Sequence, residues 1–288
     1  MGLLLKMKFH LQTQLQLLLL TFKLKSMETN PVISIRNLQK NFLNGKEVNH
    51  VLKGINLDIA PGQIIGYIGP NGAGKSTTVK ILCGLIEDFE GDITVLGHDL
   101  RTESLAIKRR IGYIPENAAM YDMLTPLEYM SFAGALYGLP EERVMEKAGK
   151  LLELFEMKKH ADQRMDTFSK GMKQKILLIS GLIHNPDIIF LDEPLSGLDA
   201  NSVMVVKEVL SQLAKDGKTI FFCSHIMDVV ERISHRIVLI NHGHVVADGT
   251  IEELRSGSSE TLEKLFADLT GQGGQTVTAE AIVQAFGN

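Results

Sequence analysis

The sequence predicts an α/β fold in which a mostly parallel sheet is flanked by helices. An apolar run at Ile64–Ile68 is followed by a glycine-rich loop and then by residues with helical spacing. Continuous apolar runs return at Ile188–Leu191 and Thr219–Cys223, and a helical pattern follows each of them. Such unbroken apolar runs are typical of parallel strands that are buried on both faces of a sheet.

Two other segments complete this prediction. Short alternating runs between residues 32 and 59, with the turn signal Asn44-Gly45, indicate an antiparallel β layer before the loop. After the loop helix, we expect a turn at Glu90-Gly91-Asp92 and a strand from residue 93. A capping box at Thr125 to Glu128 then opens a helical block, Leu127–His184, which is inserted into the α/β framework.

Composition limits the possible functions. The chain has 288 residues, of which 44% are hydrophobic and 22% charged, as in ordinary globular proteins. The net charge is −4, from 30 basic and 34 acidic residues, so no basic excess points to nucleic acid as a partner. Cys83 and Cys223 lie far apart without metal-ligand spacing, and we expect both to be buried apolar side chains.

The predicted organisation has three parts. Residues 1–30 form an N-terminal extension that is leucine-rich and basic, with no apolar run long enough to span a membrane. We interpret it as disordered or spurious; a basic amphipathic segment on a membrane surface is the alternative. Residues 31–255 form one domain, with the helical subdomain at about 117–185, and residues 256–288 form a C-terminal helix and tail.

The loop after the first buried strand carries the strongest chemical signal. It matches G-x-x-x-x-G-K-[ST] at every fixed position. Glycines let backbone N–H groups approach a phosphate, and the N-terminus of the next helix faces the same anion. The lysine adds positive charge for the terminal phosphates, and the Ser76 hydroxyl is a ligand for Mg²⁺. The predicted nucleotide-binding residues are Gly69, Pro70, Asn71, Gly72, Ala73, Gly74, Lys75, Ser76 and Thr77.

Polar side chains also follow two later strands, at the edge of the sheet where ligands bind. Asp192 is placed to hold Mg²⁺, and Glu193 to accept a proton from an attacking water. His225 is equally compatible with a γ-phosphate contact and with a structural role. Ser169 and Asp199 each precede a helical segment, so we expect both to be N-caps.

In this order, the motifs resemble the ATP-binding subunits of ATP-binding cassette (ABC) transporters over residues 32–269. The resemblance implies a P-loop NTPase core, with a Walker A loop at residues 69–77 and a Walker B strand ending at Asp192. It also implies an adenine-stacking aromatic at Phe42, although spacing alone favours a core or edge phenylalanine. The remaining positions that it implies are the signature residues Ser169, Gly171 and Gln174, the D-loop Asp199 and the switch histidine His225.

Two motifs depart from the family pattern. The signature is Ser-Lys-Gly-Met-Lys-Gln rather than Ser-Gly-Gly-Gln-x-Gln, which places Lys170 where the family has glycine. Glu116 stands in place of the Q-loop glutamine, and an ionised carboxylate cannot donate a hydrogen bond. Both variants resemble the ABC-2 type exporters, which include antibiotic-resistance and sodium-extrusion systems.

The resemblance implies an ATPase that uses ATP and Mg²⁺ and acts as a homodimer or with a paired ATPase subunit. ATP would lie between the loop of one subunit and Ser169 and Gly171 of the other, with Glu193 as general base. A separate transmembrane permease would bind the subunit peripherally at the cytoplasmic face of the membrane and would select the substrate. The alternatives are a soluble cassette acting on ribosomes or DNA, and a regulatory cassette that binds ATP without hydrolysing it.

Overall fold

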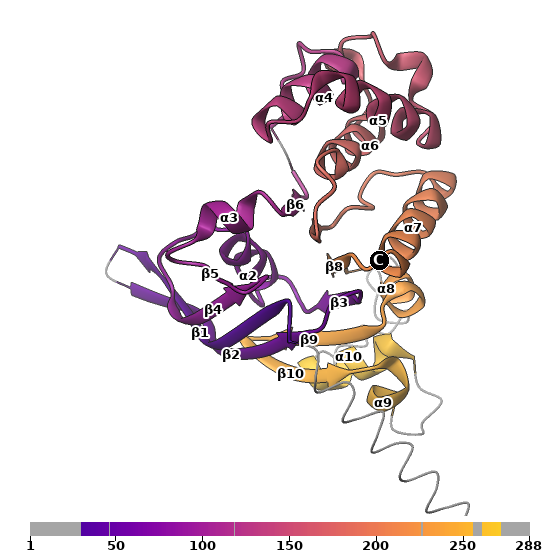
Figure 1. Cartoon of the computed structure of the whole chain (residues 1–288). Helices are drawn as coiled ribbons and strands as arrows, with labels where there is room; N and C mark the ends of the chain where they lie inside the picture. The colour runs from indigo at the N-terminus through magenta and orange to yellow at the C-terminus, as the bar shows by residue number, and fades with distance from the viewer. Residues whose placement is uncertain (1–29, 46, 118, 226, 256–260, 272–288) are drawn as a thin grey trace, which may run out of the picture.

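The computed structural model describes residues 30–45, 47–117, 119–225, 227–255 and 261–271. The predicted N-terminal extension, apart from Asn30, and the predicted tail beyond residue 271 lie outside the described residues. Figure 1 shows two sheets, helices around them and a separate group of helices above.

The larger sheet has six strands in the order β10-β9-β3-β8-β7-β6. All neighbours pair in parallel except β9 and β10, which form a hairpin. Every residue of β3, β7 and β8 is buried, which confirms the prediction from their unbroken apolar runs. The strands are β3 (Ile64–Ile68), β6 (Ile111–Ile114), β7 (Ile188–Asp192), β8 (Thr219–Cys223), β9 (Arg236–Asn241) and β10 (His244–Gly249).

The smaller sheet is the predicted antiparallel layer, in the order β2-β1-β4-β5. Its strands are β1 (Ile33–Asn44), β2 (Glu47–Ile59), β4 (Glu90–Val95) and β5 (His98–Asp99). The expected turn at Glu90-Gly91-Asp92 is wrong, because β4 already begins at Glu90. Gly91 has a φ of 95° opposite a register shift in β1, and a Cβ there would lie 2.4 Å from the Arg36 carbonyl oxygen. The glycine therefore marks an irregular strand pairing, not a turn.

The helices fall into two groups. The helical block contains α4 (Pro126–Leu136), α5 (Glu141–Leu154) and α6 (Lys170–Leu182), with short 3₁₀ turns at Lys158–His160 and Met165–Thr167. The predicted capping box is confirmed, because the Glu128 N–H donates to Thr125 Oγ1 at 3.3 Å and the Thr125 N–H donates to Glu128 Oε2 at 2.8 Å. The other helices are α2 (Lys75–Leu82), α3 (Ser104–Lys108), α7 (Ala200–Lys215), α8 (Met227–Ile233), α9 (Ile251–Arg255) and α10 (Leu262–Thr270).

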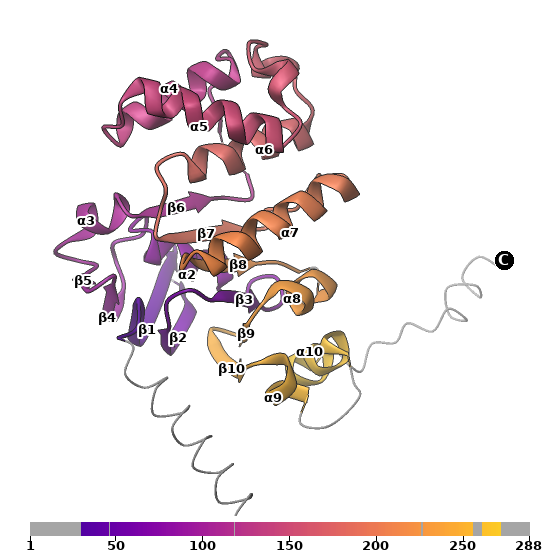
Figure 2. The same ribbon diagram turned by 45° about the vertical axis from the view of Figure 1, so that its right-hand side comes forward.

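Alternate residues of the buried strands contribute to two hydrophobic cores, one on each face of the large sheet. Ile64 and Ile68 of β3 pack with α6, α7 and α8. Ile65 and Tyr67 pack with α2 and the antiparallel sheet. Figure 2 shows α7 and α8 on one side of β3, β7 and β8, with β1, β2 and β4 on the other. This two-sided burial fixes the strand ends from which the loop and the acidic residues project.

The helical block meets the sheet where α6 crosses β6. A Cβ at Gly112 would lie 2.4 Å from the Gly181 carbonyl oxygen, and a Cβ at Gly181 would lie 2.5 Å from Ile114 Cδ1. Real Cβ atoms do not come this close to a backbone atom, so the two glycines allow the helix and the strand to touch.

We therefore expect Gly112→Ala to destabilise the protein by about 2–4 kcal/mol, because the backbone of α6 must shift away from β6. The matched control is Gly149→Ala in α5, where a Cβ meets nothing within 4 Å and better helix propensity raises stability by up to about 1 kcal/mol. Urea or thermal unfolding of both variants measures the difference. Equal stability of the two variants would contradict the close packing.

Candidate nucleotide site

A cavity of about 350 Å³ lies at the edge of the large sheet where β3 and β7 end. The glycine-rich loop forms one wall, and acidic residues after β6 and β7 form the other. Sequence reasoning missed Asn49 and Val51, two residues of β2 that also line the cavity. The lining residues are Asn49, Val51, Asn71, Gly72, Gly74, Lys75, Ser76, Thr77, Glu116, Asp192 and Glu193.

The loop adopts the strand–loop–helix form that the sequence predicts. β3 ends at Ile68 and α2 begins at Lys75, with Gly74 as the N-terminal cap at a φ of 110°. The Lys75 ammonium donates to the carbonyl oxygens of Gly69 at 2.7 Å and Pro70 at 3.2 Å. A Cβ at Gly69 would lie 2.2 Å from the Ile240 carbonyl oxygen, so β9 requires a glycine at the start of the loop. The N-terminus of α2 and the lysine together make this wall electropositive.

The opposite wall is acidic. Asp192 is 4% exposed at the end of β7, and the Ser76 hydroxyl donates a hydrogen bond to it. Burial raises the pKa of Asp192 above its ordinary value, the Ser76 hydrogen bond lowers this pKa, and the nearby Glu116 carboxylate raises it further. A hydroxyl and a carboxylate oxygen side by side form a donor set that suits a hard divalent cation such as Mg²⁺.

Glu193 and His225 are brought together by the parallel pairing of β7 with β8. The His225 Nδ1–H donates to Glu193 Oε2 at 2.8 Å, and the His225 backbone N–H donates to the same oxygen at 3.4 Å. The Glu193 backbone N–H donates to the Cys223 carbonyl oxygen at 3.0 Å. Glu193 has a φ of 49°, a strained value for a residue other than glycine. These contacts fix the Glu193 carboxylate, whose side chain is 14% exposed, at the cavity wall.

Phe42 does not line the cavity. It is 40% exposed near the end of β1, and the Lys40 ammonium lies 4.8 Å from its ring centroid. Its direct partner across the hairpin is Asn49, which does line the cavity. Because directly opposed residues project from the same face of a sheet, Phe42 lies on the face that borders the cavity.

The signature residues lie outside this cavity, and Gly171 packs against the D-loop, residues 196–199. Ser169 caps α6 by accepting from the Met172 N–H at 3.3 Å, as predicted. A Cβ at Gly171 would lie 2.6 Å from the Gly197 carbonyl oxygen, so this glycine lets the two motifs touch. Gln174 is 4% exposed, and its Nε2 donates to the Pro194 carbonyl oxygen at 3.1 Å. α6, the helix that begins with the signature residues and is called the signature helix below, is therefore joined to the segment that follows β7.

Asp199 caps α7, as its position in the sequence predicts. It accepts from the Ser202 N–H at 2.9 Å and from the Ser202 hydroxyl at 2.6 Å. These hydrogen bonds, that of the side-chain hydroxyl first, lower the pKa of Asp199 to about 2. Asp199 therefore keeps its negative charge throughout the physiological pH range.

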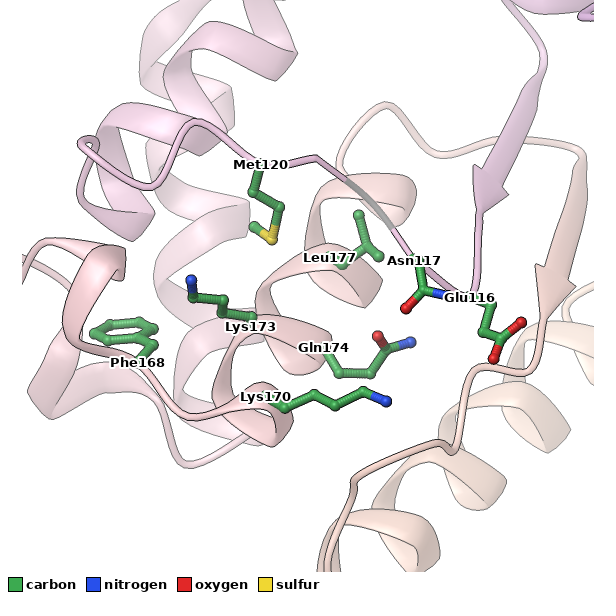
Figure 3. Close-up of a pocket in the computed structure, with 8 residues that line it drawn as sticks. All are labelled: Glu116, Asn117, Met120, Phe168, Lys170, Lys173, Gln174 and Leu177. Carbon is green, nitrogen blue, oxygen red and sulfur yellow. The ribbon is translucent and has the colours of Figure 1, made fainter.

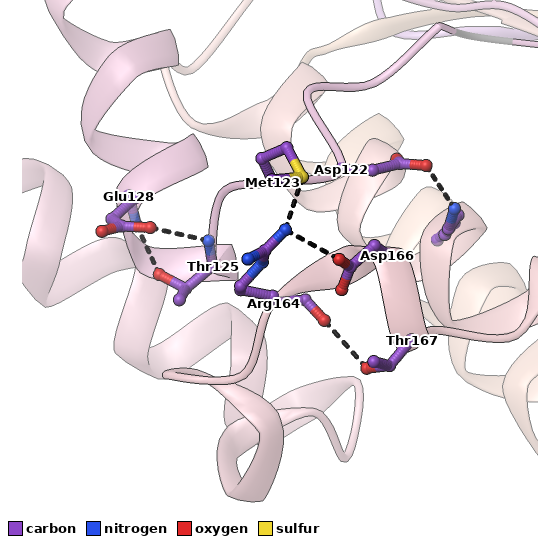
Figure 4. A network of polar contacts seen from close by, with 8 residues as sticks. Asp122, Met123, Thr125, Glu128, Arg164, Asp166 and Thr167 are labelled. Carbon is purple, nitrogen blue, oxygen red and sulfur yellow. Dashed lines mark hydrogen bonds and ion pairs between the residues drawn. The ribbon is translucent and has the colours of Figure 1, made fainter.

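A second polar network holds the segment before the signature (Figure 4). Arg164 contacts Met123 and donates to Asp166 at 2.8 Å. The Lys173 ammonium donates to Asp122 at 2.6 Å, which ties α6 to the segment that leads into α4.

A glycine-rich loop with the P-loop pattern, a buried aspartate and a glutamate held by a histidine are typical of a nucleotide-hydrolysing P-loop protein. Residues 52–196 match the ABC transporter family. The ATP-binding protein NatA of Bacillus subtilis (strain 168) is 35% identical over 82% of this chain and 96% of its own length. The linearmycin resistance ATP-binding protein LnrL of the same strain is 36% identical over 78% of this chain and 71% of its own.

Solved structures agree with these relatives. A dimeric ATP-binding cassette, MJ0796, bound to ADP and Pi in a post-hydrolysis state, superposes with a TM-score of 0.72 at 26% identity. The match covers 76% of this chain and 98% of the cassette. The chain therefore belongs to the ABC transporter family, as an ATP-binding subunit that hydrolyses ATP. The resemblance found in its motifs is confirmed, and so are the α/β P-loop fold and a function that pairs ATPase subunits with a permease.

The buried hydrogen bond from Gln174 to the Pro194 carbonyl should contribute to the free energy of unfolding. Gln174→Glu removes the donor to Pro194 and places a carboxylate against its carbonyl oxygen, so we expect a cost of about 1–3 kcal/mol. The matched control is Gln163→Glu, an exposed change that keeps an oxygen acceptor for the His160 ring, and it should stay within about 0.5 kcal/mol. Thermal unfolding compares the two, and an unchanged melting temperature for Gln174→Glu would refute the contact's importance.

Proposed function

We propose that ATP binds in the cavity formed by residues 69–77 and that Glu193 is the general base for its hydrolysis. The observation that carries this proposal is one cavity lined by the loop, Asp192 and Glu193, with the Glu193 carboxylate held by His225. Backbone N–H groups of the loop and of the α2 N-terminus hold the phosphates, and Lys75 exchanges its two carbonyl partners for phosphate oxygens. Phe42 supplies a stacking surface for the base at the rim.

Ser76 and Asp192 fit a magnesium ion, because they combine a hydroxyl with a carboxylate of low exposure at the cavity wall. When bound, Mg²⁺ neutralises charge that develops on the phosphate oxygens. Glu193 Oε2 is occupied by His225, so Oε1 is the oxygen that takes the proton of the attacking water. His225 orients this carboxylate and, within the proposal, also contacts the γ-phosphate.

Ser169 and Gly171 act, in this proposal, on nucleotide that is held by a second subunit. Two observations support it: neither residue lines the cavity of its own chain, and the similar cassette MJ0796 is dimeric with ADP and Pi bound. Gln174 and Asp199 hold the segments around these residues in place. Gln174 links the signature helix to Pro194, and Asp199 begins α7 at the end of the D-loop.

We expect Glu193→Gln to bind ATP and to accumulate as an ATP-bound dimer, with hydrolysis reduced about 10²-fold or more, because the amide cannot accept the proton. ATPase assays and size-exclusion chromatography with ATP measure both effects. Lys75→Ala is the comparison, since it should lose ATP binding and therefore dimerisation as well. Hydrolysis at the parental rate by Glu193→Gln would show that another group is the base.

We further infer that the subunit serves an exporter and lies peripherally on the cytoplasmic face of the membrane. The similarity to the linearmycin resistance protein supports export. Among the described residues, no helix has the length and apolar character to span a bilayer. A permease supplied by another chain would provide the membrane anchor and select the substrate.

The membrane proposal predicts that the tagged chain fractionates with membranes and co-purifies with a polytopic membrane protein. High salt or alkaline washing should release the subunit, because the attachment is peripheral. Recovery only with ribosomes or DNA would favour the soluble-cassette alternative instead.

A further inference from the structure

Glu116 and Lys170 both depart from the family pattern, and they line one cavity. This second cavity, of about 300 Å³, lies between the segment after β6 and the N-terminal half of α6. Figure 3 shows the Lys170 side chain extending along one side of the cavity in the direction of Glu116, whose carboxylate lies at the edge of the cavity. They do not form an ion pair in this structure. The described residues offer Glu116 no hydrogen bond, and Lys170 only the neutral Ser196 hydroxyl at 3.2 Å.

Glu116 also lines the nucleotide cavity, together with Asp192 and Glu193. Three carboxylates in one cavity repel one another, and their repulsion rises as the cavity loses water. A cation beside Glu116 would offset that repulsion. Such a cation would also fix the carboxylate that stands where the family has a neutral glutamine.

Lys170 is the lysine best placed to supply that charge. Lys75, across the nucleotide cavity, is held by two loop carbonyls. Lys173 lines the second cavity beside Lys170, but its ammonium is 2.6 Å from the Asp122 carboxylate. Lys170 is exposed and has a long flexible side chain, and it lines the same cavity as Glu116.

We propose that Glu116 and Lys170 form an ion pair across this cavity when the cavity narrows around bound ATP. The pair positions Glu116 at the nucleotide and, through Ser196, joins it to the D-loop. Lys170 is thus a positioning residue, and its positive charge compensates the negative charge of Glu116. This inference rests on the proposed function, because the cavity that narrows is the neighbour of the ATP site.

The test is a set of ATPase measurements on the full chain with Glu116→Gln, Lys170→Gln and the double variant. We expect Lys170→Gln to lower kcat about five-fold in the parental chain but less than about two-fold in the Glu116→Gln background. Lys170→Arg should restore kcat to within about two-fold, and the difference between backgrounds should shrink at about 1 M salt, where charges are screened. Both residues are exposed, so we expect every variant to fold, and thermal unfolding of each variant is the check.

Lys173→Gln is the matched control, because this lysine lines the same cavity but already has an acidic partner. It should change kcat by the same factor in the parental chain and in the Glu116→Gln variant. An equal loss from Lys170→Gln in both backgrounds would overturn the ion pair while leaving the ATPase function intact. ATP hydrolysis by the Lys75→Ala variant at the parental rate would instead overturn the proposed nucleotide site, and the ion pair with it.

Discussion

The two-sided burial of β3, β7 and β8 is the constraint on which the site depends. These strands are apolar throughout most of their length, so they pair side by side in the centre of the sheet. Their parallel direction brings the residues that follow each strand to one edge. The phosphate-binding loop, the Asp192–Glu193 pair and His225 come from segments far apart in the chain, and this pairing alone makes them neighbours.

A second consequence concerns the signature helix. Gly171 touches the Gly197 backbone, and Gln174 holds the Pro194 carbonyl, immediately after Glu193. The residues proposed to act on the partner's nucleotide are therefore packed on the segment that follows Glu193, the proposed base of this chain. We propose these contacts as the physical route for communication between the two ATP sites of a dimer.

Local patterns predicted much of this structure because local interactions fix it. The loop, the capping box at Thr125 and the caps Ser169 and Asp199 depend on residues within a few positions of each other. The features that sequence reasoning missed depend on residues that are far apart in the chain. Gly91 resembles a turn residue but accommodates a register shift in β1, and Asn49 lines the site on β2, which pairs with β1. The His225–Glu193 bond likewise needs the register of β7 on β8, which no local pattern specifies.

In the proposed dimer, the loop of one subunit and the signature of the other are two halves of a shared ATP site. The most direct measurement is a structure of the full chain with Mg²⁺ and a non-hydrolysable ATP analogue. We predict a head-to-tail dimer in which the analogue's phosphates contact Lys75 and Ser76 of one subunit and Ser169 and Gly171 of the other. An analogue bound to the loop with no second subunit over it, or bound elsewhere in the chain, would contradict a shared ATP site.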